Sequence, residues 1–335
     1  MRHANISVFV PHMGCPHRCS FCDQNSITGT DIPVTSDDIE TAVNAAVNSK
    51  NYNGENTELA FFGGSFTAIE RDFTKPLLKK AKEYIDNGII SGIRISTRPD
   101  YIDENILTYL KGYGVTSIEL GAQSMDDQVL KANFRGHTAK DVENASALIK
   151  KFGFELGLQM MTGLYKSDAV KDTLTAEKLI ALNPQTVRIY PAITLKGTLL
   201  EHLYKSGEYM PPSLEDTVRL CADLYRLFTE NGIKVIRIGL HSIDKDSYVA
   251  GPWHPSFGEL CESRILLNRL LSGLSHEQPG EYFLYVSPRD VSKMIGQKRH
   301  NIIVLREKGY DCTVLAREEV PHGTVHYERT DKSCT

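Results

Sequence analysis

Short β-rich runs alternate with longer amphipathic segments from residue 5 to about residue 240, and this alternation constrains the fold more than any other feature of the sequence. The pattern is typical of βα units arranged around a parallel sheet. About six such units predict an α/β fold with a partial β/α barrel, in which catalytic groups lie at the carboxyl ends of the strands. The expected strands cover residues 5–10, 58–62, 92–96, 116–121, 155–160, 186–190 and 233–239.

Capped or acidic first turns predict helices that begin near Ser36, Asp103 and Ser213, between the expected strands. The pattern changes after the seventh strand, so we expect a barrel domain over residues 1–245 and a C-terminal extension with a small α+β appendage over residues 246–335. The appendage is expected to hold a helix pair and strands at residues 282–286, 311–316 and 323–328.

Three cysteines follow the first expected strand, with the spacing Cys-x3-Cys-x2-Cys at Cys15, Cys19 and Cys22. A structural zinc site normally closes with four ligands, whereas three thiolates can hold three irons of a 4Fe–4S cluster and leave the fourth iron open. Zinc is the alternative, with His12 or His17 as the missing ligand, but the spacing fits no zinc finger, ribbon or knuckle. The sequence therefore favours an iron–sulfur cluster with one open iron.

This stretch, with the aromatic Phe21 before its last cysteine, resembles the signature of the radical S-adenosylmethionine superfamily. The resemblance implies a 4Fe–4S cluster and S-adenosylmethionine as cofactors, with the methionine amino and carboxylate groups on the open iron. It also implies an enzyme in which an external low-potential donor reduces the cluster. Cleavage of S-adenosylmethionine then gives a deoxyadenosyl radical that takes hydrogen from the substrate.

Further candidate cofactor contacts follow the second and third expected strands. Gly63, Gly64 and Ser65 occupy the position that holds the methionine amino group in the superfamily, although a plain tight turn also explains two adjacent glycines. Relatives often carry a glutamate where this chain has Ser96, so that contact is expected to be weaker or to come from another residue.

Glu119, Gly121 and Gln123 share one face of the fourth expected strand, by the two-residue period of a β-strand. We expect them to point into the barrel mouth, although a buried pair satisfied by neighbouring backbone explains Glu119 equally well. This part of the chain resembles the radical domain of the Elongator catalytic subunit. In that domain and its relatives, the positions of Gln123 and Gln159 face the adenosyl group.

An ordered set of motifs extends the resemblance over about residues 5–265. The set resembles the radical domain of the Elongator catalytic subunit and, more distantly, oxygen-independent coproporphyrinogen oxidase. The motifs lie at residues 96–100, 121–124, 134–138, 158–164, 188–191, 196–200, 207–209 and 251–260.

The net charge of -4 argues against a surface that holds nucleic acid mainly through phosphates, so a small-molecule substrate is expected. The chain has 14 residues before its first cluster cysteine and no room for an acetyltransferase domain, which predicts an Elongator-like radical domain without its tRNA grip. The layout is compatible with bacterial queuine lyase. The specific expectation is therefore a lyase of queuosine salvage that acts on a modified nucleobase and releases its 7-deazaguanine precursor.

For such a substrate, Glu119 is expected to pair with the guanine-like edge, and Arg237, His241 or Tyr190 with the hydroxylated ring. Tyr190 is also a candidate radical relay by its position. His254, between two prolines, is either a structural hydrogen-bonding residue or a further substrate contact.

The alternative function is a tRNA-modifying enzyme of the Elongator-like group that binds RNA through its C-terminal tail. The expected helix pair around Gly296 resembles a KH nucleic-acid module, but Arg299 stands where the second glycine of its GXXG loop belongs. Residues 288–335 carry 9 Lys+Arg and 7 Asp+Glu, which favours a packing appendage. A non-catalytic iron–sulfur or zinc protein is the third possibility.

No signal segment opens the chain, and no apolar run is long enough to span a bilayer. The remaining cysteines, Cys221, Cys261, Cys312 and Cys334, are scattered singly, as in a reducing compartment. We therefore expect a cytoplasmic protein with no membrane partner.

Overall fold

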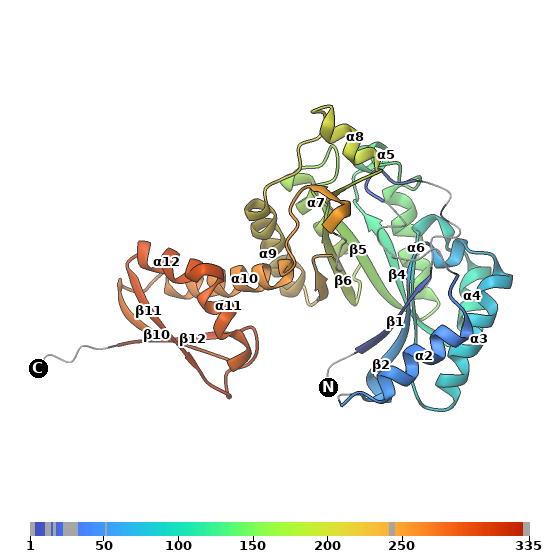
Figure 1. The fold of residues 1–335 in the computed structure, drawn as a ribbon, viewed down its shortest axis with the longest axis horizontal. Coiled ribbons are helices and arrows are strands. Elements are labelled where there is room, and N and C mark those ends of the chain that lie inside the picture. The colour runs from blue at the N-terminus through green and yellow to red at the C-terminus, as the bar shows by residue number, and fades with distance from the viewer. Residues whose placement is uncertain are drawn as a thin grey trace, which may run out of the picture. The chain divides into compact units, whose positions relative to one another are not determined.

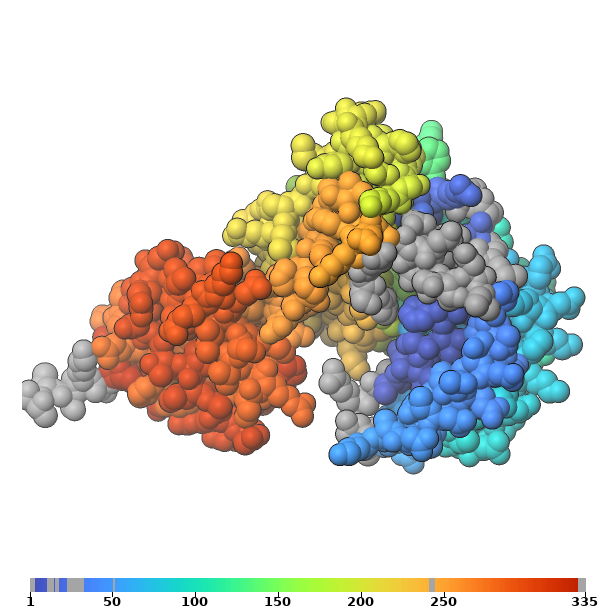
Figure 2. Space-filling model, viewed as in Figure 1, coloured from blue at the N-terminus to red at the C-terminus, as the bar shows by residue number. Residues whose placement is uncertain are grey.

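The computed structural model describes residues 4–10, 15, 18–22, 33–50, 52–240 and 245–330. The chain divides into two compact units: Met1–Pro212 with Phe228–Pro252, and Ser213–Leu227 with Trp253–Thr335. Figure 2 shows the surface of the molecule from one side.

The two units differ from the two domains expected from the sequence. The boundary lies after Pro252 rather than at residue 245, and the long helix α9 (Leu214–Glu230) is shared between the units. Its first part belongs to the second unit because it packs on the helix α10, where Arg264 lies 3.8 Å from Glu215. No boundary signal in the sequence marks that division inside a continuous helix.

The first unit is built on a curled parallel sheet of seven strands (Figure 1), in the order β1-β2-β3-β4-β5-β6-β8. All seven expected strands are present, and the predicted α/β fold with a partial barrel is confirmed. The strands are β1 (Ala4–Val10), β2 (Thr57–Gly63), β3 (Gly92–Thr97), β4 (Val115–Gln123), β5 (Glu155–Thr162), β6 (Thr186–Pro191) and β8 (Lys234–Ile238).

Helices connect these strands, and several of them begin at residues whose side chains cap them. Thr35 and Asp38 form a capping box, and the Asp103 side chain accepts a hydrogen bond from the Ile106 backbone amide, so the predicted helix starts near Ser36 and Asp103 are confirmed. The helices are α2 (Ser36–Val47), α3 (Arg71–Asp86), α4 (Glu104–Gly112), α5 (Asp127–Ala132), α6 (Ala139–Lys151), α7 (Ala169–Ala181), α8 (Leu199–Lys205) and the shared α9.

Successive residues of each strand alternate between the two faces of the sheet. The outer face carries apolar side chains that are almost fully buried, as at Leu120, Leu158 and Ile189. The inner face carries charged and amide side chains, as at Glu119, Gln159 and Arg188. The core of the first unit therefore lies on one side of the sheet, and the polar groups on the other.

The second unit has its own sheet, in which β10 (Gly280–Val286) pairs parallel with β11 (Tyr310–Ala316) and antiparallel with β12 (Val325–Arg329). Leucines of α10 (Phe257–Leu274) pack on this sheet. The helices α11 (Val291–Ile295) and α12 (His300–Glu307) lie between β10 and β11 in sequence, so the expected α+β appendage is present.

A short antiparallel pair of β7 (Thr194–Leu195) and β9 (Tyr248–Ala250) belongs to the first unit and was not expected from the sequence. Its strands are too short to show a period-two pattern. Across the residues that the structure describes, none of the helices is both long and apolar enough to cross a membrane.

Candidate active site

The cysteine loop follows β1 and is fixed to the segment after α5. The Ser20 backbone amide donates a hydrogen bond to the Asn133 carbonyl oxygen at 3.1 Å, and the buried Ser20 hydroxyl donates to Asn133 Oδ1 at 2.6 Å. Cys15, Cys19 and Cys22 are partly exposed and form no disulfide. The loop is thus anchored at Ser20, while its three thiols remain accessible.

A cationic donor contacts the Cys19 thiol, and a backbone amide contacts the Cys15 thiol. Arg135 donates from Nη1 to Cys19 Sγ at 3.1 Å and from Nη2 to the Gly121 carbonyl at 2.6 Å. Burial raises the pKa of the Cys15 thiol, and a hydrogen bond from the Ser65 backbone opposes that rise. Donors of this kind stabilise thiolates, the form in which cysteine binds iron. The three cysteines and Arg135 therefore suit an iron–sulfur cluster.

Arg135 was not assigned a role from the sequence, although the motif at residues 134–138 contains it. The signal was present in the run Arg135-Gly136-His137 directly after α5, but its partner Cys19 lies 116 positions earlier in the chain. Within the described residues, no three histidine, cysteine, aspartate or glutamate side chains are gathered around one point that would hold a single metal ion. His12 and His17, which the zinc alternative requires, lie outside the described residues.

Three buried polar atoms close to this edge of the sheet have no hydrogen-bond partner among the described residues: Gln123 Oε1, Arg135 Nε and His137 Nδ1. Such atoms are rare in folded proteins. Gln123 also has φ +65°, a left-handed conformation that is uncommon outside glycine, at the place where the register of β4 and β5 shifts. Unsatisfied atoms and backbone strain at one place point to a ligand site.

His137 is a second residue that the sequence interpretation did not single out. Its Nε2 lies 3.2 Å from the Ala122 carbonyl oxygen, and burial with the nearby Arg135 charge lowers its pKa to about 4. The imidazole is therefore neutral at physiological pH. Arg98, which pairs with Asp100 at 2.9 Å and also donates to the Arg135 carbonyl, completes the polar wall here.

The end of β2 approaches β1 more closely than any side chain would allow. Gly63 has φ +121° and pairs in register with Val10, and a Cβ atom at Gly63 would overlap the Val10 carbonyl oxygen. The buried Ser65 hydroxyl lies 2.9 Å from Thr97 Oγ1. The roles of Gly63, Gly64 and Ser65 in holding a cofactor stay predictions.

The inner face places Gln159 between two polar partners. Its Nε2 donates to Glu119 Oε2 at 2.9 Å and to Ser96 Oγ at 3.3 Å. The sequence interpretation named Ser96 and Gln159 as candidate cofactor contacts and Glu119 as a candidate substrate contact, and the structure brings the three side chains together. Their roles toward a cofactor or a substrate stay predictions.

Glu119 is 1% exposed, and both of its carboxylate oxygens are bonded within the protein. Arg188 donates to it from Nε at 2.7 Å and from Nη2 at 3.0 Å, and Arg94 donates from Nη1 at 3.4 Å. The expectation was of a carboxylate available to a substrate or satisfied by backbone. The structure instead satisfies it with two guanidiniums and the Gln159 amide.

Arg94 is the centre of this buried network. It is 2% exposed and donates to Glu58 and Glu155 at 2.8 Å each, in addition to Glu119. The three carboxylates come from β2, β4 and β5, so one guanidinium of β3 joins four strands across the inner face.

The remaining predicted substrate residues lie in different places. Tyr190 is half-buried on β6 beside Met161 and Leu164, and burial raises its pKa, so the phenol is neutral. Arg237 lies on the inner face at the end of β8. His254 belongs to the second unit, and its Nδ1 accepts a hydrogen bond from the Ser256 amide at 3.1 Å.

The predicted contact at His241 lies outside the described residues. Phe21 is half-buried at the cysteine loop, with the Arg135 guanidinium carbon 6.0 Å from its ring centre. Its contact with a cofactor also stays a prediction.

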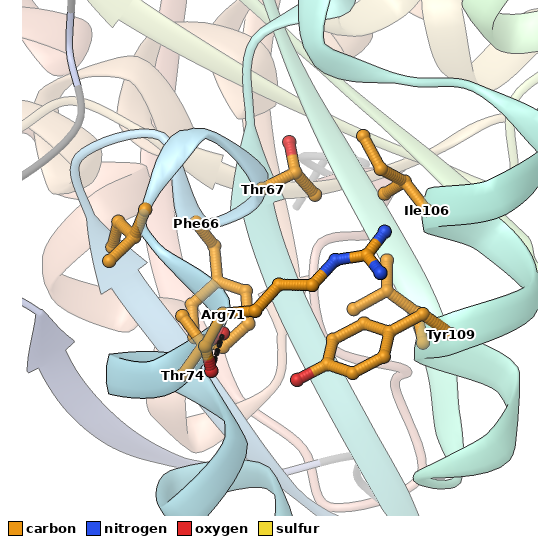
Figure 3. A pocket seen from close by; sticks show the side chains of 8 residues that line it. Phe66, Thr67, Arg71, Thr74, Ile106 and Tyr109 are labelled. Atoms are coloured by element: carbon orange, nitrogen blue, oxygen red, sulfur yellow. Dashed lines mark hydrogen bonds between the residues drawn. The ribbon is translucent and has the colours of Figure 1, made fainter.

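A small pocket lies outside this set of residues, between the turn after β2 and the helices α3 and α4 (Figure 3). The Arg71 guanidinium carbon lies 4.9 Å above the ring of Tyr109 at its rim. None of the site residues expected from the sequence lines this pocket. Its lining residues are Phe66, Thr67, Ile69, Arg71, Thr74, Ile106, Tyr109 and Leu110.

Comparison with known families gives two matches along the chain. The family described as "Radical SAM superfamily" matches residues 9–176, and the family described as "Radical_SAM C-terminal domain" matches residues 184–266. Together they extend from the end of β1 to α10, with a gap at residues 177–183.

Among curated proteins, the chain is 24% identical over 257 residues to a tRNA uridine(34) acetyltransferase of Dehalococcoides mccartyi (strain CBDB1), covering 66% of this chain and 56% of that protein. It is 30% identical over 193 residues to Elongator complex protein 3 of Homo sapiens, covering 52% and 35%. The chain thus spans between about a third and somewhat more than half of these relatives.

Among solved structures, the archaeal Methanocaldococcus infernus Elp3 with N-terminus deletion (1-46) superposes with a TM-score of 0.63 at 21% identity. The match covers 83% of this chain and 65% of that one. At this level of identity the likeness supports the fold.

Proposed function

Because the chain belongs to the radical S-adenosylmethionine superfamily, we propose that it holds a 4Fe–4S cluster through Cys15, Cys19 and Cys22 and abstracts hydrogen from a nucleotide of a tRNA. When bound, the cluster and S-adenosylmethionine supply a deoxyadenosyl radical, with the electron coming from an external low-potential donor. The single observation that supports the site best is the hydrogen bond from Arg135 to Cys19 at the carboxyl end of the sheet.

The chain's own residues bind and orient the reactants. Arg135 stabilises the Cys19 thiolate by a charge-assisted hydrogen bond, and the Ser65 backbone does the same for Cys15. The unpartnered Gln123 Oε1 provides an acceptor for a ligand group. The proposed cofactor contacts are Phe21, Gly63, Gly64, Ser65, Ser96, Gln123 and Gln159.

The relatives favour RNA over a free base as the substrate. The tRNA uridine(34) acetyltransferase named above acts, by its name, on a tRNA, and the other curated relative is an Elongator protein. The main sequence expectation, a queuine lyase of queuosine salvage, has no support among the relatives reported above. The alternative, a tRNA-modifying enzyme of the Elongator-like group, is the function that these relatives favour.

The second unit offers a surface for the RNA backbone in the loop between α11 and α12. Lys298 and Arg299 are exposed and adopt left-handed conformations, with φ +51° and +61°. Gly296 begins the loop, and the buried Asn301 holds it by donating to the Lys293 and Met294 carbonyls. Two adjacent, exposed cations suit phosphate contacts. We include this loop in the proposal as the tail's RNA-binding element.

The test is to measure which compound accelerates deoxyadenosine formation by the full chain, reconstituted with iron and sulfide under anaerobic conditions. We expect unmodified tRNA to accelerate it and free queuine to leave the uncoupled rate unchanged. Acceleration by queuine alone would contradict the RNA substrate and return the lyase function to first place.

A further inference from the structure

Arg237 is a cation of the inner face, and its hydrogen-bond partners among the described residues are backbone carbonyls. Its Nε donates to the Gly239 carbonyl at 3.1 Å and its Nη2 to the Leu240 carbonyl at 2.9 Å. No carboxylate among the described residues lies within ion-pair distance of it. Both partners are uncharged backbone groups near the carboxyl end of β8, so the guanidinium keeps its full charge there.

The other two inner-face guanidiniums show what full compensation looks like. Arg94 pairs with Glu58 and Glu155 at 2.8 Å, and Arg188 binds Glu119 through two hydrogen bonds. These bonds use both oxygens of Glu119, so that carboxylate is engaged with Arg188 and Arg94. Within the part of the chain that the structure describes, Arg237 therefore differs from Arg94 and Arg188 in having backbone carbonyls and no carboxylate as partners.

The position of Arg237 makes an external anion more favourable still. It is paired in register with Arg188 on the neighbouring strand, and like charges on adjacent strands repel each other. Arg237 is half-buried, and burial together with the Arg188 charge lowers its pKa, while Tyr190 acts in the opposite direction. An anion bound here would relieve the repulsion and replace lost solvation.

We propose that Arg237 binds a backbone phosphate of the substrate RNA beside the nucleotide that reacts. The inference rests on the proposed function, because it takes the RNA as the source of the anion. The planar guanidinium fork matches phosphate oxygens through two parallel hydrogen bonds. A free base such as queuine carries no phosphate, so Arg237 would select a nucleotide within a chain over the free base.

The experiment measures equilibrium binding of a fluorescent tRNA anticodon stem–loop to the full-length, reconstituted protein over a range of salt concentrations. R237Q should weaken binding roughly ten- to a hundredfold, the effect of one lost charge-assisted hydrogen bond. It should also make the slope of log K against log salt shallower by about 0.7–0.9, the release of one phosphate's counter-ion. R237K should keep the slope, since it keeps the charge, and bind less tightly than wild type.

The matched control is K234Q, which removes one exposed positive charge from the same strand β8 at its other end. Its affinity and its salt slope should equal those of wild type. If R237Q behaves like K234Q, the phosphate contact is wrong while the proposed function stands. If wild type binds no stem–loop and tRNA fails to accelerate deoxyadenosine formation, the proposed function and this inference fall together.

A second measurement uses only the wild-type protein and so does not depend on the folding of a variant. Stem–loops with one neutral methylphosphonate linkage, placed in turn at each position of the loop, are titrated against it. One linkage adjacent to the reacting nucleotide should weaken binding to the extent seen with R237Q. Equal affinity for every linkage would overturn the proposal.

Discussion

The two faces of the seven-stranded sheet are made from alternate residues of the same strands, yet they are built on different physical principles. On the outer face, Leu120 and Leu158 are buried among other apolar side chains, and each contributes by its own removal from water. On the inner face, Glu119 and Arg188 are also buried, and their attraction mainly offsets the cost of their desolvation. The comparison teaches that the outer face stabilises the fold, whereas the inner face fixes polar groups in place.

The largest expected effect is on activity, in variants of the three cysteines. These variants should lose function with little change in the free energy of unfolding. C15A, C19A or C22A should each abolish iron binding and S-adenosylmethionine cleavage, because each thiolate holds a different iron. The free energy of unfolding of the iron-free protein should change by less than about 1 kcal/mol, as expected for partly exposed side chains. Iron analysis and urea unfolding measure the two quantities. An iron-replete, active variant would contradict the cluster assignment.

The next largest effect compares the two faces directly. R94M removes the guanidinium that binds three carboxylates and should cost roughly 3–5 kcal/mol of unfolding free energy at neutral pH. L158A on the outer face should cost roughly 2–5 kcal/mol by leaving a cavity. The two decreases in unfolding free energy are expected to depend differently on pH. The R94M deficit should shrink in acid, where the unpaired carboxylates become protonated, and the L158A deficit should not. Urea unfolding at two pH values checks this, and equal pH dependence would break the comparison.

Asp172 on α7 sharpens the comparison, because it is a buried carboxylate held by neutral donors only. It accepts hydrogen bonds from the Gly163 amide at 2.8 Å and the Ser167 hydroxyl at 2.6 Å, and burial raises its pKa to about 6. The folded state therefore binds the proton more tightly than the unfolded state, whose pKa is near 3.8. The stability from this group is present below about pH 4 and is lost as the pH rises to about 6, by roughly 3 kcal/mol.

The measurement is thermal unfolding of wild type and D172N between pH 4 and 7. The advantage of wild type over D172N should decrease as the pH rises through this window. A difference that does not depend on pH would show that Asp172 is already ionised at pH 4.

The smallest effect concerns the second unit. K298Q removes one exposed cation from the loop between α11 and α12 and should weaken binding of the anticodon stem–loop by a few-fold, the scale of one solvent-exposed phosphate contact. K308Q, at the other end of α12, removes an equally exposed charge and serves as the control. Equal affinities of the two variants would remove the loop from the proposed RNA surface.

The outer face could be predicted from the sequence, and the inner face only in part. The runs that contain Leu120, Leu158 and Ile189 are recognisable because apolar residues and strand length are local properties. The same two-residue period places Glu119 and Gly121 on one face, but the register shift between Gly121 and Gln123 breaks that period before it reaches Gln123. The period could not supply the partners of Glu119, because Arg94 and Arg188 lie 25 and 69 positions from Glu119 in the chain. Pairings of this kind depend on strand order and register rather than on local pattern.

The site shows the same limit. The cysteine spacing predicts three residues of the candidate site, and their role in holding a cluster stays a prediction. Arg135 could not be predicted from the spacing, because its contact with Cys19 arises only in the folded chain. In the second unit, an arginine at position 299 is not expected in the left-handed conformation that a glycine adopts easily, yet Arg299 has φ +61°. Packing around the buried Asn301 overrides the local preference of an arginine there.

Because Gly63 approaches Val10 so closely, a displacement of β2 at the carboxyl end of the sheet would also displace β1. Any side chain at Gly63 would push on the backbone of Val10, the last residue of β1, from which the cysteine loop departs. A substitution at Gly63 in β2 would then displace the cysteine loop that follows the neighbouring strand β1, rather than disturb β2 alone. A screen for inactivating substitutions would record Gly63 as if it were a cluster ligand, although it has no atom that can bind iron.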